Sequence, residues 1–350
     1  MTREADLKRR VDWIDTAKFW GMLFIYIGHF GPDAGLINPW VWKFHVMLFF
    51  FLSGCVENFN HRGFLENLKH KAVYTLLPFY FFGLISVLYA LIRDNSIQVL
   101  QNGIRVILLG GVRNSIEYGV GLWFLSCLFV VQVLFSIIKK IKYKTAVLVI
   151  CFGLHLLAIY VIDPPKWYYN VDSAFDFIIF YCLGWILYPL IDRTLNSRRP
   201  RVRIIRAVVT AGCLIYTGYL YLGRNLLAPL FNLHPAMEAV QGLIMPMANF
   251  WVVIVISYLF PAELLKQIGR HSLYMCGNEF IVRNLVTQIL AFFGVTYTIT
   301  SPVQTCLYCF GLLILADKVL VPVEKPMLVK LQNMFTKRTP DHGYGSSLIG

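Results

Sequence analysis

Long apolar stretches alternate with short polar segments along the whole chain. Stretches without Lys, Arg, Asp or Glu include 72–92, 118–138, 145–162, 207–223 and 239–262. Each approaches or exceeds the about 17–25 residues that a membrane-spanning helix needs. A transmembrane β-barrel is excluded, because it would show alternating segments of about ten residues instead. The pattern therefore predicts an all-α, polytopic integral membrane helix bundle.

Ten candidate transmembrane helices can be drawn on this pattern. They are 17–30, 39–56, 73–92, 120–138, 145–162, 175–191, 204–223, 239–260, 273–293 and 302–321. We expect a cytoplasmic N-terminal arm at 1–16, a ten-helix membrane domain at 17–322 and a flexible cytoplasmic tail at 323–350.

Composition and charge agree with a membrane protein. Hydrophobic residues make up 57% of the chain and charged residues 15%, whereas a soluble domain carries roughly 25% charged residues. The formal net charge of +13 would suit nucleic acid, but 25 of the 32 Lys and Arg residues lie at the termini and in alternate loops. By the positive-inside rule, both termini then face the cytoplasm, as in a multi-pass protein of the plasma (inner) membrane. The orientation of the chain in the lipid bilayer explains the positive charge, which therefore does not indicate binding to nucleic acid.

Three ionisable residues share one face of the first predicted span. At 100° per residue, Lys18 and His29 lie within an arc of about 60° that begins at Asp15, and Tyr26 lies on the same stripe. Ionisable side chains inside a span are costly, which makes them candidates for a functional site. Two plainer interpretations stay open: Asp15 and Lys18 as an interfacial pair at a helix end, and His29 as a histidine bonded to a neighbouring helix.

A second histidine, His45, enters the second span at a depth similar to that of His29. The two histidines can therefore meet, and imidazole suits a general base that takes a proton from a hydroxyl. No third histidine or carboxylate accompanies them convincingly, so we expect no metal. In the same span, Ser53 and Gly54 favour close helix packing.

The ninth span carries Glu279 and Arg283. They are four residues apart, so a mutually neutralising pair and a role in a site are both open. The outer loop at 163–169 holds a Trp and two Tyr residues that could stack on sugar rings, although an aromatic belt at the membrane surface explains them equally simply.

Four segments, in order, resemble the membrane acyltransferase-3 family. Asp15, Lys18 and His29 fit its opening pattern D-x-x-[RK]-x10-H. The segments FHVMLFFFLSG, GLWFLSCLF and IGRHSLYMCGNEF are similar to that family's FHMPLFFFLSG, WFL and IGKxSLYIYxxHF motifs. Lys18 and the preceding WID resemble the branch that is similar to fucose 4-O-acetylase.

This resemblance implies transfer of an acyl group, usually acetyl from cytoplasmic acetyl-CoA, to a hydroxyl of a surface polysaccharide or lipid-linked sugar. The family's essential histidine maps onto His29, which we expect to be the general base. Glu279 stands where many relatives have histidine, so it could act as an acid.

The remaining candidates surround these two residues. Tyr26, His45 and Trp123 are expected to line the site or orient its groups, and Arg283 to bind alongside Glu279. Lys18, Lys69 and Lys71 are candidate contacts for the coenzyme's phosphates, next to Asp15, although basic loop residues also serve topology.

Other functions stay open at this point. A proton-coupled transporter or flippase for a glycan or lipid-linked sugar would use His29, Glu279 and Arg283 as its binding site. A structural partner in an envelope assembly would not need His29. Direct transfer and a relay through an acetyl-histidine are both compatible with the sequence.

Overall fold

The computed structural model is mainly helical in the residues that it describes, which are 11–31, 34–94, 96–113, 115–116, 118–224, 235–295 and 299–336. No strand occurs among them, which confirms the predicted all-α class. Eight helices are long and apolar enough to cross a membrane by length and composition. They are Ile37–Glu57, Phe64–Asp94, Val120–Ile138, Lys144–Ile162, Tyr168–Asn196, Pro200–Tyr221, Glu238–Leu259 and Pro302–Phe335.

The helices fall into two compact units. The first comprises Met1–Asn60, Phe180–Arg270 and Ile299–Phe310, and the second comprises His61–Ile179, His271–Thr298 and Gly311–Gly350. Two helices contribute residues to both units, namely α10 (Val171–Asn196) and α16 (Pro302–Leu315).

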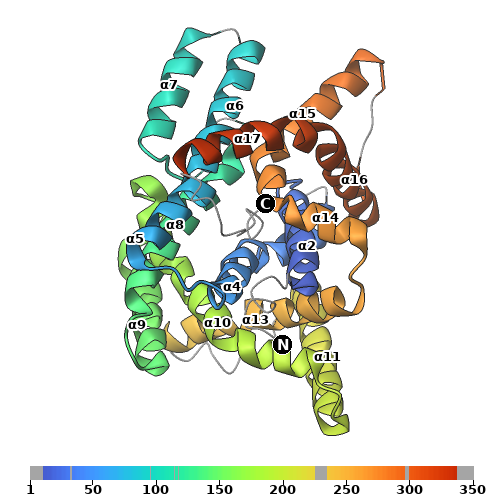
Figure 1. Ribbon diagram of the computed structural model, residues 1–350. Helices are drawn as coiled ribbons and strands as arrows, with labels where there is room; N and C mark the ends of the chain where they lie inside the picture. Colours follow the sequence, from blue (N-terminus) through green and yellow to red (C-terminus); the bar gives the residue numbers. More distant parts are fainter. Residues whose placement is uncertain are drawn as a thin grey trace. The chain divides into compact units, whose positions relative to one another are not determined.

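Helix α2 (Asp12–Gly28) is the packing centre of the first unit. Most of its residues are buried, and it contacts α3, α4, α13 and α14. Figure 1 shows α11 beside α13, a contact that the packing confirms. These elements are α3 (Ile37–Val41), α4 (His45–Glu57), α11 (Pro200–Tyr221), α13 (Pro235–Leu259) and α14 (Glu263–Arg270).

The second unit is built around helices α6, α8 and α15. The hairpin of α6 and α7 is seen in Figure 1 in turquoise, and the two helices pack on each other. The α-helices of the second unit are α5 (Phe64–Lys71), α6 (Leu77–Asp94), α7 (Ile97–Leu108), α8 (Trp123–Ile138), α9 (Lys144–Leu157), α15 (Ser272–Phe292) and α17 (Val321–Phe335). Short π-helical or 3₁₀ turns extend them at Ala72–Leu76, Val120–Leu122, Ala158–Ile162, Tyr168–Asn170 and Ala316–Leu320.

All ten predicted spans coincide with helices, with differences in detail. The first helix begins at Asp12 rather than at residue 17, and the helices α5, α7 and α14 lie outside the predicted spans. The tail expected from residue 323 is wrong in its first part, because α17 continues to Phe335. Residues 337–350 of that tail, and 1–10 of the predicted N-terminal arm, lie outside the described residues.

Helices α4 and α10 approach each other through a pair of glycines, as the Ser53–Gly54 pattern predicts. A Cβ on Gly54 would lie 2.0 Å from the backbone oxygen of Tyr181, and a Cβ on Gly184 would lie 2.0 Å from that of Phe51. Backbone atoms at that distance cannot yield as a flexible side chain can. The contact therefore requires glycine at both positions.

We expect Gly54→Ala to destabilise the protein by about 1–3 kcal/mol, because the added methyl group forces the two helices apart. Gly153→Ala in α9 is the matched control, since a Cβ there meets nothing within 4 Å. Alanine is intrinsically better than glycine in a helix by about 0.5–1 kcal/mol, so the control should be neutral or slightly stabilising. Thermal unfolding of the purified variants in one lipid environment measures both. Equal stability of the two variants would contradict the close α4–α10 contact.

Candidate active site

His29 sits directly after the last residue of helix α2, at the end that two side chains hold in place. The carbonyl oxygen of Gly28 accepts a hydrogen bond from Asn38 Nδ2 at 2.7 Å and another from Trp42 Nε1 at 3.1 Å. The His29 backbone N–H donates to Ile25 and so completes the helix. These bonds satisfy the helix end, where carbonyl groups otherwise lack partners, and they fix the position from which the His29 ring projects.

His45 lies next to His29, as the sequence predicts. The centroids of the two rings are 6.4 Å apart and their planes are nearly perpendicular. Trp42 contacts both rings, with centroid distances of 5.8 Å to His29 and 5.0 Å to His45. Trp42 and Asn38 were not predicted, because their role depends on bonds between segments that no local pattern reveals.

One ring nitrogen of His45 is hydrogen-bonded to the backbone. Its Nδ1 lies 2.7 Å from the carbonyl oxygen of Val41, which can only accept, so Nδ1 carries the proton. In the neutral ring, Nε2 is then the nitrogen with a lone pair. That atom is buried without a hydrogen-bond partner, and a Cβ on Gly28 would lie 3.6 Å from it. His45 thus presents an acceptor nitrogen toward the end of α2.

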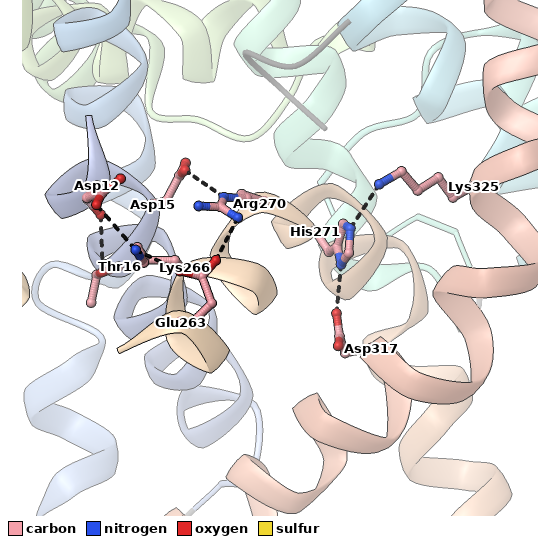
Figure 2. A network of polar contacts seen from close by, with 9 residues as sticks. All are labelled: Asp12, Asp15, Thr16, Glu263, Lys266, Arg270, His271, Asp317 and Lys325. Atoms are coloured by element: carbon pink, nitrogen blue, oxygen red, sulfur yellow. Dashed lines mark hydrogen bonds and ion pairs between the residues drawn. The ribbon is translucent and has the colours of Figure 1, made fainter. Parts of the chain in front are cut away.

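Charged residues form a network at the other end of α2, as Figure 2 shows. Asp15 accepts a hydrogen bond from Arg270 Nε at 3.2 Å, whereas Lys18 Nζ lies 3.7 Å from its second oxygen. Arg270 also binds Glu263 at 2.9 Å. Lys266 lies 2.7 Å from Glu263 and 3.2 Å from Asp12. The predicted Asp15–Lys18 pair exists, but Arg270 makes the shorter contact with Asp15.

The network joins α2 to α14 at a point where their backbones nearly touch. A Cβ on Gly269 would lie 1.8 Å from the Asp15 carbonyl oxygen, so only glycine permits the approach that brings Arg270 to Asp15. The hydrogen bond from Lys266, supported by Arg270, lowers the pKa of Glu263 below 4.5. Burial disfavours the charge of Arg270, but Asp15 and Glu263 outweigh burial and raise its pKa. The contribution of Glu263 to the stability of the folded protein is therefore present above pH 4.5 and is lost as the pH falls through the lowered pKa of Glu263.

We expect Arg270→Gln to destabilise the protein more than Lys266→Gln. Asp15 is buried, with 7% of its surface exposed, so removing Arg270 leaves a carboxylate in a poorly solvated place. The partners of Lys266 are largely exposed, which makes that contact weak. In an Asp15→Asn background the effect of Arg270→Gln should shrink, giving a coupling energy of about 1 kcal/mol. Additive losses in thermal unfolding would contradict the pairing.

Glu279 and Arg283, in the second unit, occupy different surroundings on α15. Glu279 is 3% exposed, and its Oε2 lies 3.7 Å from where a Cβ on Gly121 would stand. The Arg283 guanidinium carbon lies 4.8 Å from the Phe280 ring centroid. Glu279 therefore faces the turn that begins α8, and that turn leads directly to Trp123.

The Trp123 ring is in contact with an arginine side chain. The guanidinium carbon of Arg113 lies 4.2 Å from the Trp123 ring centroid, and Arg113 Nη2 donates to Ser173 Oγ at 3.1 Å. Burial lowers the pKa of Arg113, while Asp176 and Asp172 oppose that effect. Trp123 is thus half of a cation–π pair within the second unit.

Lys69 and Lys71 differ in how far their side chains are exposed. They are two residues apart on one helix, hence on opposite faces, and Lys69 is exposed whereas Lys71 is 5% exposed. Among the described residues of α5, Lys69 is therefore the one placed to meet a phosphate from solution. In the first unit Tyr26 is buried, at 2% exposure, within the stripe predicted for α2.

A hydrogen-bonded group of His271, Asp317 and Lys325 lies in the second unit and was not predicted. His271 Nδ1 lies 2.7 Å from Asp317 Oδ1, and Lys325 Nζ lies 3.1 Å from His271 Nε2 (Figure 2). An ammonium group can only donate, so Nε2 accepts and Nδ1–H donates to the carboxylate. This neutral imidazole connects the start of α15 to the last helix. Within the described part of the chain, no group of three or more His, Cys, Asp or Glu residues is placed to hold a metal ion.

Comparison with known families identifies the class of protein. A family model described as an acyltransferase domain matches residues 11–317. Since this match spans most of the chain, the protein belongs to the acyltransferase-3 family of membrane acyltransferases. No curated protein and no solved structure matches the chain at a significant level.

Proposed function

We propose that this membrane acyltransferase moves an acetyl group from acetyl-CoA to a hydroxyl of a surface polysaccharide or lipid-linked sugar. His29 is the general base in this proposal. The observation that carries it is the placement of His29 within the family match: the ring projects from the bonded end of α2 and lies beside His45. The proposed class of acceptor follows the resemblance to the branch similar to fucose 4-O-acetylase.

The chemistry needs one proton acceptor at the sugar hydroxyl. His29 takes the hydroxyl proton while the sugar oxygen forms a bond to the thioester carbonyl carbon, the carbon–sulfur bond breaks, and the CoA thiolate then receives the proton. His45, whose Nδ1 is committed to Val41, supports this step by presenting only an acceptor nitrogen to the same region. Glu279 is proposed as an acid, with Arg283 alongside it, and neither assignment is needed for the first step.

Acetyl-CoA is proposed to enter from the cytoplasm, the side on which we place both termini of an inner-membrane protein. Lys18 at the start of α2 and Lys69 on α5 are each proposed as a contact for its phosphates. The buried Lys71 is a weaker candidate.

We expect His29→Ala to lower kcat by at least about 100-fold, because general-base catalysis contributes about 10²–10⁴-fold. His61→Ala, at an exposed histidine, is the matched control and should keep wild-type rates. The assay adds labelled acetyl-CoA and a membrane glycan fraction to protein in lipid nanodiscs, and follows CoA release and label in the glycan. A His29→Ala variant that stays folded and active would refute the assignment of the base. Glycan movement without CoA release in the wild type would instead favour a transporter.

We expect Lys69→Ala to raise the KM for acetyl-CoA about 3–10-fold at low salt with kcat unchanged, because one charge-assisted phosphate contact is lost. Lys142→Ala, at an exposed lysine on another loop, is the control and should leave KM unchanged. The difference should shrink at high ionic strength, where solution charges are screened. An unchanged KM in Lys69→Ala would remove Lys69 from the coenzyme site.

A further inference from the structure

We propose that Trp42 is a stacking platform for a pyranose ring of the carbohydrate acceptor. The inference rests on the proposed function, which leaves open how the acceptor is held near His29. It starts from one side chain that is exposed, fixed and adjacent to both histidines.

The indole of Trp42 is unusually open for a residue in contact with the candidate base. It is 51% exposed, while its ring centroid lies 5.8 Å from that of His29 and 5.0 Å from that of His45. A sugar ring resting on the open part of the indole, at a contact distance of about 4 Å, would stand beside the His29 ring. Such a sugar would present hydroxyl groups within reach of the base.

The orientation of this indole argues against an aromatic-belt residue. A belt tryptophan keeps its polar N–H toward the watery membrane surface and its rings toward lipid. In Trp42 the N–H donates inward to the Gly28 carbonyl oxygen at 3.1 Å. The polar group is used to fix the ring, and the hydrocarbon face is what remains available. An aromatic ring fixed in this way offers a preoriented flat surface to the C–H face of a sugar, at low entropic cost.

Trp40, two residues earlier, shows the structural alternative in the same segment. Its Nε1 donates to Asn249 Oδ1 at 3.1 Å, and its ring packs against Phe24 and Phe44 with centroid distances of 5.5 and 5.0 Å. Trp40 is enclosed by aromatic neighbours and holds α3 to α13. The two indoles have similar anchoring bonds and opposite surroundings, which makes Trp40 a natural control.

Trp42 makes two separable contributions, and different substitutions remove them. Trp42→Ala removes both the ring and the bond to Gly28, so the KM for the acceptor should rise at least tenfold and kcat should fall. Trp42→Phe keeps a ring but loses the N–H, so the KM should stay within about threefold of wild type while kcat falls. The KM for acetyl-CoA should be unchanged in both. Trp40→Phe should leave the acceptor KM unchanged.

The experiment uses the full chain in lipid nanodiscs, because glycosidic detergents would themselves supply sugar rings. Labelled acetyl-CoA and an extracted lipid-linked sugar fraction are the substrates. Tryptophan fluorescence is titrated with the same sugar fraction in the absence of acetyl-CoA, and the wild-type response is compared with that of Trp42→Phe. A quenching component present in wild type and missing in Trp42→Phe is expected.

The outcomes distinguish this inference from the proposed function. Acyl transfer by the wild type with an acceptor KM in Trp42→Ala within twofold of wild type would overturn the platform and leave the acyltransferase proposal intact. Absence of transfer in the wild type, with the Trp42-dependent quenching still present, would keep the sugar platform and count against acyl transfer. Absence of both signals would overturn both proposals.

Discussion

Helix α2 is held at both of its ends by side chains from other segments, and the candidate site depends on that attachment. At one end Arg270 binds Asp15, where Gly269 lets α14 approach. At the other end Asn38 and Trp42 bind the Gly28 carbonyl oxygen. A helix fixed at both ends projects the next residue, His29, in one direction. The general base is therefore positioned by hydrogen bonds and ion pairs rather than by apolar packing alone, which is non-directional.

Several candidate residues lie on the two predicted spans that fit a membrane least well by length and composition. Two of the ten predicted spans, α2 and α15, are not among the helices that are long and apolar enough to cross by composition. These two helices carry half of the candidate residues, including Asp15, Lys18 and Glu279. Buried polar groups in an apolar surrounding need partners, and α2 finds them in α14 and in the segment before α4. Burying these polar residues costs free energy, and this cost is the reason to regard them as functional.

Much of the fold could be predicted from the sequence, because apolar stretches of spanning length force helices in a bilayer. The helical class and the positions of the ten spans followed from this rule. Helix α14 was not predicted, because it is short and half of its residues are charged or polar, so no apolar stretch marks it. The continuation of α17 to Phe335 was not predicted, because charged residues and prolines interrupt its apolar pattern.

The candidate site was only partly predictable. Helical spacing placed Asp15, Lys18 and His29 on one face, and similar depth brought His45 to His29. Arg270, Asn38 and Trp42 could not be found in this way, because their partners lie 10 to 255 residues away in the chain. The different burial of Lys69 and Lys71 was predictable in principle, since residues two apart cannot share a helix face.

The central claim is that acyl transfer to a saccharide depends on the base at the end of α2. The most direct measurement is a single-turnover experiment with wild-type protein, labelled acetyl-CoA and purified lipid-linked sugar in nanodiscs, with the label located by chemical analysis of the sugar. The account predicts one labelled ester on a sugar hydroxyl for each CoA released, formed at a rate that falls at least about 100-fold when His29 is replaced by alanine. CoA release with no ester on the sugar, or an ester formed at the same rate when His29 is replaced, would contradict it.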